Sequence, residues 1–248
     1  MPSPKLRAKL QPVYQDLPLQ NGILRCLHPA EISGENAKYM KMYDWMGRWY
    51  DLGEQWIGRI KYGNSVITTR RALMHELEWR QDATALYVSI GTGIDLNYLP
   101  ADIDIATLDI TGLDLSLGML RRCRRVWQKK APGLDLVHAN AETLPFRDNG
   151  FDIVFHVGGI NFFNDKARAI REMLRVAKPG SKIMIADETS DFIDQQYKKS
   201  GFTRRYFADT HFDLGEIKNS IPADVVERRT QLLWDNRFYC ITFRKGLY

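Results

Sequence analysis

The chain has 248 residues, which is enough for one large domain or for one domain with an appended segment. Its hydrophobic fraction of 44% and net charge of +5 are ordinary for a globular protein, and no apolar run reaches the roughly 18 residues of a membrane span. Three scattered cysteines (Cys26, Cys123 and Cys240) form neither a disulfide framework nor a zinc-ligand pattern. Because the N-terminus also lacks an apolar signal segment, we expect a cytoplasmic protein without a metal site and without stable membrane insertion.

The first third of the sequence divides into two segments. Residues 1–36 contain five prolines and little periodicity, which predicts an extended arm. Residues 37–82 are helical in pattern and rich in aromatic side chains, more than one helix face can bury by itself. These aromatics are expected to pack mainly on the rest of the chain, with an apolar pocket, a membrane surface or a partner as the alternatives.

From Ala83 onward, strand-like and helix-like stretches alternate up to about residue 186. Such alternation predicts a doubly wound, mostly parallel α/β sheet. Near the C-terminus, two further strand-like runs are separated by only three residues, which predicts an antiparallel hairpin and a total of seven strands. The expected strands are 85–90, 109–115, 134–139, 151–157, 182–186, 225–234 and 238–244. Residues 83–248 are therefore interpreted as one domain, over which the helices of 37–82 form a lid.

A glycine turn, Gly91-Thr92-Gly93, follows the first of these strands directly. Glycines at the carboxyl end of a strand let a ligand approach the backbone closely. About 20 residues further on, Asp114 stands at the end of the second strand, where a carboxylate suits the two hydroxyls of a ribose. The alternative is a tight turn of the kind found in any α/β protein, but the spacing favours a nucleotide site.

Three further strings are more specific than the glycines. They are Gly112-Leu-Asp-Leu-Ser-Leu-Gly-Met-Leu120, then Asn140-Ala-Glu-Thr-Leu-Pro-Phe146 with Asp148-Asn-Gly-Phe-Asp152, and Glu172-Met-Leu-Arg-Val-Ala-Lys-Pro-Gly180. In this order they resemble class I S-adenosylmethionine-dependent methyltransferases. The resemblance covers residues 83–248 and is greatest to the subgroup that contains the ubiquinone/menaquinone-biosynthesis C-methyltransferases. The string Trp49-Tyr50-Asp51 resembles the Tyr-Asp pair of the N-terminal helices that cover the cofactor in that subgroup.

This resemblance implies S-adenosyl-L-methionine as the cofactor and assigns residues to its parts. Asp114 is expected to hold the ribose, Leu115 and Met119 to enclose the adenine, and Asn140-Ala141 or Glu142 to meet the adenine edge. The resemblance also places Ser89, Gly91, Gly93, Val157 and, from the lid, Tyr50 near the methionine and ribose portion of the cofactor.

The first motif departs from the family pattern at two positions. Tyr87 stands where the family has an acid, and Ser89 stands where it has a first glycine. The contact that the acid helps to make, near the methionine amino group, must therefore come from elsewhere or be absent.

His156, at the end of the fourth strand, is the candidate general base, because histidine titrates near neutral pH. A packed structural histidine is the alternative. Asp187, Glu188 and His211 are further candidates for the mouth of the site, and Asn161, Phe162 and Phe163 for a substrate wall. The aromatic surroundings favour transfer of a methyl group to carbon, oxygen or nitrogen of a small or medium hydrophobic molecule.

Two rival interpretations stay open. A nicotinamide dehydrogenase would require a third glycine or alanine where Leu96 stands. A domain that binds the cofactor but acts as a cyclase or an interaction partner is the other rival. The basic run 121–125 lies on the helix after the second strand, away from the expected mouth, so we expect no nucleic-acid substrate. The aromatic lid either covers its own site or exchanges with a second copy, which leaves a homodimer open.

Overall fold

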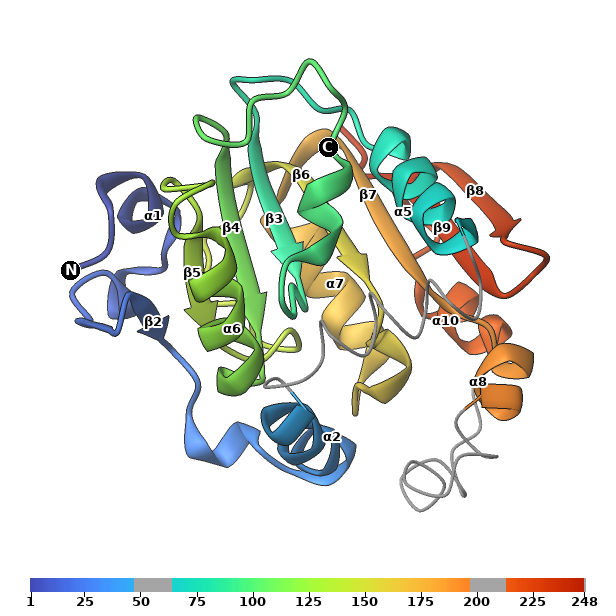
Figure 1. Cartoon of the computed structure of the whole chain (residues 1–248), viewed down its shortest axis with the longest axis horizontal. Helices are drawn as coiled ribbons and strands as arrows, with labels where there is room; N and C mark the ends of the chain where they lie inside the picture. Colours follow the sequence, from blue (N-terminus) through green and yellow to red (C-terminus); the bar gives the residue numbers. More distant parts are fainter. Residues whose placement is uncertain (47–63, 197–212, 248) are drawn as a thin grey trace.

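The computed structural model describes residues 1–46, 64–196 and 213–247 (Figure 1). Five parallel strands in the order β5-β4-β3-β6-β7 form the centre of the sheet. Their bounds are β3 (Thr84–Val88), β4 (Asp109–Asp114), β5 (Asp135–His138), β6 (Phe151–Val157) and β7 (Ala177–Glu188). The order reverses beside β3, so the predicted doubly wound fold is confirmed. A crevice at the carboxyl ends of the strands is the usual ligand position in such sheets.

The C-terminal hairpin is also as predicted. β9 (Phe238–Arg244) inserts antiparallel between β7 and β8 (Val226–Leu233). Trp234, Asp235 and Asn236 in the connection all have positive φ. Three successive residues in the left-handed region reverse the chain within the four-residue connection 234–237.

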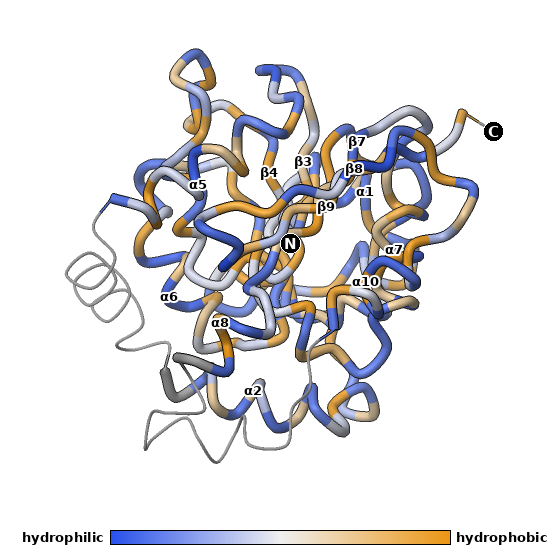
Figure 2. Tube along the Cα trace, turned by 90° about the vertical axis from the view of Figure 1, so that its right-hand side faces the viewer, coloured by the Kyte–Doolittle hydropathy of each residue, from blue (hydrophilic) through white to orange (hydrophobic). Residues whose placement is uncertain are grey.

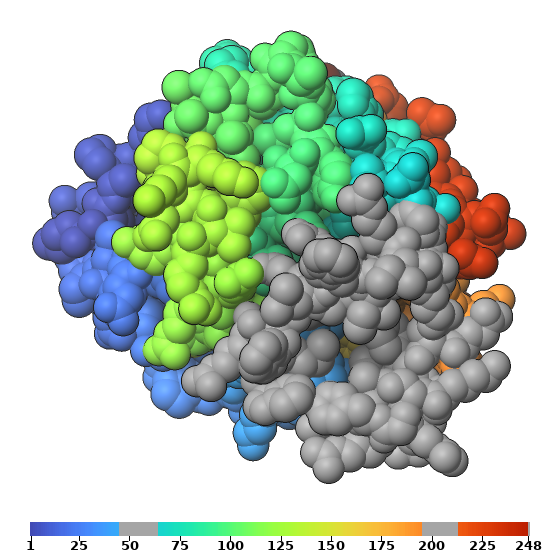
Figure 3. Space-filling view, in the orientation of Figure 1, coloured from blue at the N-terminus to red at the C-terminus, as the bar shows by residue number. Residues whose placement is uncertain are grey.

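Within the described part of the chain the sheet has nine strands, not the predicted seven, because the N-terminal segment joins it. Where an extended arm was expected, the structure has helix α1 (Pro4–Lys9), the short strands β1 (Leu19–Gln20) and β2 (Ile23–Arg25), and the 3₁₀ turns η1 (Pro12–Tyr14) and η2 (Pro29–Glu31). β1 and β2 are antiparallel, and β2 pairs parallel with β5. Strands this short carry no periodic signal, and their pairing depends on β5, more than 100 residues away in sequence. Figure 3 shows this segment, in blue, as one flank of the molecule and the C-terminal strands, in red, as the other.

Helices cover both faces of the sheet (Figures 1 and 2). One face carries α5 (Ser65–Glu76), the 3₁₀ helix η4 (Ile94–Tyr98) and α6 (Leu117–Trp127); the other carries α7 (Lys166–Val176) and α10 (Leu214–Ser220). α6 buries Leu120, Cys123 and Trp127 against the sheet and keeps its arginines outward. Successive residues of a strand serve opposite layers of core: Leu86 and Val88 pack on the α7 side, Ala85 and Tyr87 on the α6 side.

Helix α2 (Gly34–Met46) lies outside both layers, across the carboxyl ends of the strands (Figure 1). The carboxylate of Asp44 accepts hydrogen bonds from the Ser116 hydroxyl (2.6 Å) and from the Gly118 backbone N–H (2.8 Å). These contacts hold the C-terminal part of α2 against the start of α6. α8 (Ser190–Gln196) follows β7 near the same edge, joined to it by a link through Thr189. Among the described residues, no helix combines the length and apolar character that crossing a bilayer requires.

Candidate active site

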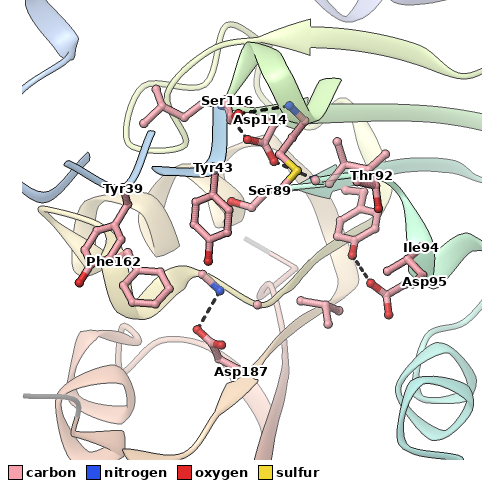
Figure 4. Close-up of a pocket in the computed structure, with 18 of the residues that line it drawn as sticks. Tyr39, Tyr43, Ser89, Thr92, Ile94, Asp95, Asp114, Ser116, Phe162 and Asp187 are labelled. Carbon is pink, nitrogen blue, oxygen red and sulfur yellow. Dashed lines mark hydrogen bonds between the residues drawn. The ribbon is translucent and has the colours of Figure 1, made fainter. Parts of the chain in front are cut away.

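A cavity of about 220 Å³ opens at the carboxyl ends of β3, β4, β6 and β7, beneath α2 (Figure 4). Polar groups of the glycine turn and of the strand ends line it on the sheet side, and aromatic side chains line it on the side of α2. The cavity lining includes Tyr39, Tyr43, Arg70, Tyr87, Ser89, Gly91, Thr92, Asp95, Asp114, Leu115, Ser116, Met119, Val157, Gly158, Gly159, Phe162, Phe163, Asp187 and Glu188.

The glycine turn after β3 exposes its backbone to this cavity. Gly91 has φ +56°, and a Cβ built on it would meet nothing within 4 Å, so it leaves space for a ligand. Gly93, with φ +76°, does not line the cavity; a Cβ there would lie 2.7 Å from Nε1 of Trp127. The Trp127 indole in turn donates to the Thr92 carbonyl at 3.1 Å. The two glycines thus serve different purposes: one opens the cavity and the other lets α6 pack against the turn.

Ser89 lines the cavity and keeps the backbone shape of the glycine that it replaces. Its φ is +58°, in the left-handed region that a side chain with a Cβ rarely adopts. The turn therefore has, at this position, a backbone conformation that glycine adopts more readily than serine.

Asp114 ends β4 with its carboxylate held by two backbone N–H groups. Oδ2 accepts from Gly91 at 2.7 Å, and Oδ1 accepts from Ser116 at 2.8 Å. Burial raises the pKa of Asp114 to about 6, although these hydrogen bonds favour the ionised form. Each carboxylate oxygen still has a lone pair for a ligand hydroxyl. Leu115 and Met119 lie beside it, and the Ser116 side chain caps α6 by accepting from the Met119 N–H at 3.2 Å.

A cluster of three side chains borders the cavity on the far side of the glycine turn from Asp114. The Tyr87 hydroxyl donates to Asp95 in η4 (Figure 4). Arg70 from α5 pairs with the other oxygen of Asp95 at 2.5 Å. Sequence reasoning named Tyr87 only as a departure and missed Asp95 and Arg70 altogether. The acid two residues after Gly93 was the available signal, but nothing local linked it to a helix some 25 residues upstream.

The wall opposite the glycine turn is aromatic. The Tyr39 and Phe162 rings lie with centroids 4.2 Å apart, and Tyr43 stands between them and the glycine turn (Figure 4). Burial, together with the nearby carboxylates of Glu188 and Asp187, raises the pKa of Tyr43 well above its usual value. The expected wall residues Phe162 and Phe163 line the cavity, whereas Asn161 is turned to Asp187 and the Glu188 carbonyl.

Asp187 closes this end of the cavity. Its Oδ2 accepts from the backbone N–H groups of Gly159 (3.0 Å) and Asn161 (3.3 Å). Burial raises the pKa of Asp187 to about 6, against the effect of these hydrogen bonds. Gly158 and Gly159, both with positive φ, have open space where a Cβ would project.

His156 does not line the cavity, so the expectation that it acts as the general base is corrected. Along β6, Val157 points to the cavity, so its neighbour His156 points to the opposite face of the sheet. There the ring is fully buried and packs edge-on against Phe163. Burial lowers its pKa to about 3, which keeps the imidazole neutral. His156 is therefore a packed structural histidine, as the alternative interpretation of the sequence had it.

The three residues expected at the adenine edge also lie outside the cavity lining. Glu142 is buried and accepts from the Asn36 side chain and the Asn164 backbone, both at 2.9 Å. Asn140 accepts from the Glu142 N–H at 2.9 Å, and Ala141 belongs to the hydrophobic core. This loop ties α2 to the start of α7. Tyr50 and His211 lie outside the described residues.

The doubly wound sheet carries a glycine turn after β3, an acid after β4 and an antiparallel hairpin beside β7, which together match the layout of class I methyltransferases. Residues 86–185 match the family model described as a methyltransferase domain. The demethylmenaquinone methyltransferase of Bacillus licheniformis is 38% identical over 150 residues, which are 58% of this chain and 61% of that protein. The chain therefore carries a methyltransferase domain with the fold of the class I S-adenosylmethionine-dependent methyltransferases.

Solved structures agree in fold. A SAM-dependent methyltransferase from Thermotoga maritima, described as a possible histamine N-methyltransferase, has a TM-score of 0.59 at 18% identity and covers 86% of this chain and 100% of its own. The [4+2]-cyclase SpnF has a TM-score of 0.58 at 15% identity, over 73% of this chain and 81% of its own. The chain spans between about a third and three fifths of the length of the curated relatives it matches.

Proposed function

We propose that this protein transfers the methyl group of S-adenosylmethionine to a small or medium hydrophobic molecule. The observation that carries the proposal is that the Asp114 carboxylate and the open backbone of Gly91 border one cavity, joined by a 2.7 Å hydrogen bond. A ribose placed against Asp114 would have the space above Gly91 beside it. The residues present thus fit an adenosyl group.

The chain's own residues have separable tasks in this proposal. S-adenosylmethionine, when bound, supplies an electrophilic methyl group on sulfur. Asp114 accepts hydrogen bonds from the ribose hydroxyls, and Leu115 and Met119 enclose the base. α2, held at Ser116 by Asp44, excludes water from above the cavity and helps to align the acceptor. With His156 away from the cavity, no side chain is assigned as a general base.

The acceptor is proposed to lie against the aromatic wall. Tyr39, Tyr43 and Phe162 offer ring faces, and their apolar surface favours a molecule that carries an apolar ring or chain. The relative from Bacillus licheniformis carries the name of an enzyme for demethylmenaquinone, which supports a ring-bearing hydrophobic acceptor. Residues 37–82 are proposed to act as the lid of this acceptor site.

The second candidate is a domain that binds the cofactor without methyl transfer. Tyr87 and Ser89 depart from the family's first motif, and the fold also occurs in the cyclase SpnF. In this case the same cavity would bind the cofactor and turnover would be absent.

Two measurements test the proposal. Isothermal titration with S-adenosylhomocysteine should give micromolar or tighter binding, weakened by Asp114→Asn and unchanged by Asp102→Asn, an exposed carboxylate outside the cavity. Formation of S-adenosylhomocysteine from S-adenosylmethionine should then depend on an acceptor from a panel of quinols, phenols and aryl amines. Binding without turnover across the panel would favour the second candidate, and absence of binding would contradict both.

A further inference from the structure

The cluster of Arg70, Tyr87 and Asp95 is more deeply buried than a surface ion pair. Asp95 is 1% exposed, and the Arg70 side chain is 16% exposed. Tyr87 is 1% exposed, stacks on Phe155 with centroids 4.2 Å apart, and directs its hydroxyl to Asp95. The three side chains come from α5, β3 and η4, so three elements are needed to build the cluster.

Burying such a charged cluster adds little to the stability of the fold, so its presence calls for a functional explanation. Removing two opposite charges from water carries a large desolvation cost before their attraction is counted, and apolar residues of similar size often serve stability equally well. All three residues also line the cavity. A paired carboxylate and guanidinium at a cavity wall are complementary to a zwitterion, whose ammonium can approach the first and whose carboxylate the second.

The position of the Arg70, Tyr87 and Asp95 cluster indicates which end of a bound ligand would contact it. Asp114 and the cluster flank the glycine turn on opposite sides (Figure 4). A ligand whose ribose lies on Asp114 and whose chain crosses Gly91 would bring its other end to Asp95 and Arg70. The amino-acid end of an S-adenosyl compound is a zwitterion of this kind.

We propose that Asp95 binds the α-ammonium group of the cofactor and Arg70 its α-carboxylate, with the Tyr87 hydroxyl holding Asp95 in place. The acid that the strand lacks at position 87 is thereby supplied from η4, eight residues later. This inference deepens the proposed function and rests on it.

The test compares ligands that differ only at the amino-acid end. S-adenosylhomocysteine carries the zwitterion, and 5′-methylthioadenosine lacks it but keeps ribose and adenine. In titration calorimetry, Asp95→Asn and Arg70→Met should each weaken S-adenosylhomocysteine about 10- to 100-fold, as expected for hydrogen bonds to charged groups, and change 5′-methylthioadenosine by about twofold or less. Asp114→Asn should weaken both ligands.

Analogues of S-adenosylhomocysteine sharpen the assignment. The compound without the α-amino group should be insensitive to Asp95→Asn, and the compound without the α-carboxylate should be insensitive to Arg70→Met. Tyr87→Phe keeps the stacking on Phe155 and should weaken S-adenosylhomocysteine severalfold. It also serves as the test if Asp95→Asn does not fold.

A matched control is the buried pair of Lys9 and Asp109, 2.5 Å apart and outside the cavity lining. Asp109→Asn should lower the melting temperature and leave the ratio of the two affinities unchanged. The inference is overturned if the variants of the cluster bind both ligands as the parent does, or weaken both equally. If the parent protein binds neither ligand, the proposed function itself has failed.

Discussion

Two carboxylates close opposite ends of the cavity, and they are built alike. Asp114 ends β4 and accepts from backbone N–H groups of Gly91 and Ser116; Asp187 ends β7 and accepts from those of Gly159 and Asn161. Burial raises both pKa values to about 6. Their surroundings differ, because Asp114 lies beside an open glycine and an apolar helix start, whereas Asp187 lies beneath tyrosine and phenylalanine rings.

The difference shows that a strand-end carboxylate held by backbone N–H groups does not by itself determine which ligand it would bind. A carboxylate that caps a turn after a strand is a way to shape a loop, and it occurs here twice. What suits Asp114 to the proposed ribose site is the free volume over Gly91 and the apolar flank of α6. Asp187 has its Oδ2 committed to two backbone donors and its Oδ1 to the Glu188 N–H, and serves to shape the acceptor end.

The largest expected effect separates these two acids. Asp114→Asn should weaken S-adenosylhomocysteine on the order of 100-fold, because it replaces an ionised acceptor of ligand hydroxyls with a neutral amide. Asp187→Asn should change that affinity by about threefold or less and affect the acceptor's KM instead. Titration calorimetry and acceptor kinetics measure the two effects. Equal losses of cofactor affinity in both variants would show that the two ends are not distinct.

The next effect concerns the glycines beside Asp114. Gly93→Ala should lower the free energy of unfolding by about 2–4 kcal/mol, since a left-handed alanine is strained and its methyl group collides with Trp127. Gly91→Ala meets no neighbour, so it should cost only about 1–2 kcal/mol of stability but fill space that the ligand needs. Urea denaturation and ligand titration on both variants check this. A Gly91→Ala variant with unchanged affinity would contradict the position given to the ligand.

A smaller effect should appear with pH. Below about pH 6 Asp114 becomes protonated and loses acceptor capacity, so affinity for S-adenosylhomocysteine should fall by up to about tenfold per pH unit, and this fall should vanish in Asp114→Asn.

Stability should change in the opposite direction with pH. A carboxyl group whose folded pKa is raised binds its proton more tightly in the native state, so the stability contributed by Asp114 and Asp187 is largest below about pH 4 and is lost as pH rises through about 6. Asp187→Asn should reduce this decline in thermal unfolding followed from pH 4 to 7. A parent protein whose stability contribution from these groups rises over that range would contradict the assignment of burial as the cause.

The smallest effect is expected at His156, which lies in the strand between the two acids. His156→Leu should leave cofactor affinity and the pH profile of turnover unchanged, because the ring faces away from the cavity and is neutral at all working pH values. Stability should stay the same or rise by up to about 1 kcal/mol, since an apolar side chain replaces a buried polar one. A loss of turnover with intact cofactor binding would restore this histidine as a candidate base.

Sequence patterns predicted what depends on neighbours in the chain. Each central strand is a short apolar run ended by a turn, so the sheet could be foreseen. Asp114 and Gly91 carry a recognisable spacing, so their meeting at the ends of neighbouring strands could be foreseen as well. The motif placed Asn140 and Glu142 at the adenine edge, but their side chains have other partners. Glu142 accepts from Asn36 of α2 and from the Asn164 backbone, and Asn140 bonds to the Glu142 N–H and the Glu31 carbonyl. His156 was assigned by its position at a strand end, and the alternation of side chains along β6 decided against it.

The contacts that could not be foreseen are those between distant segments. Arg70 reaches Asp95 from α5, and Asp44 reaches Ser116 from α2, with no local pattern to announce either pairing. Strand β2 is similar, because three residues form a strand only when a neighbouring edge receives them.

That last pairing has a consequence for the edge of the sheet. Without β2, the outer side of β5 would offer unpaired peptide groups to any passing chain; with it, Ile23, Leu24 and Arg25 occupy the register opposite 136–138. At the other margin β8 presents the charged residues Glu227, Arg228 and Arg229 to solvent, which discourages strand addition by different means. A shortened chain that begins after residue 26 should therefore self-associate, visible as a concentration-dependent mass in light scattering, even though every group that lines the cavity is still present.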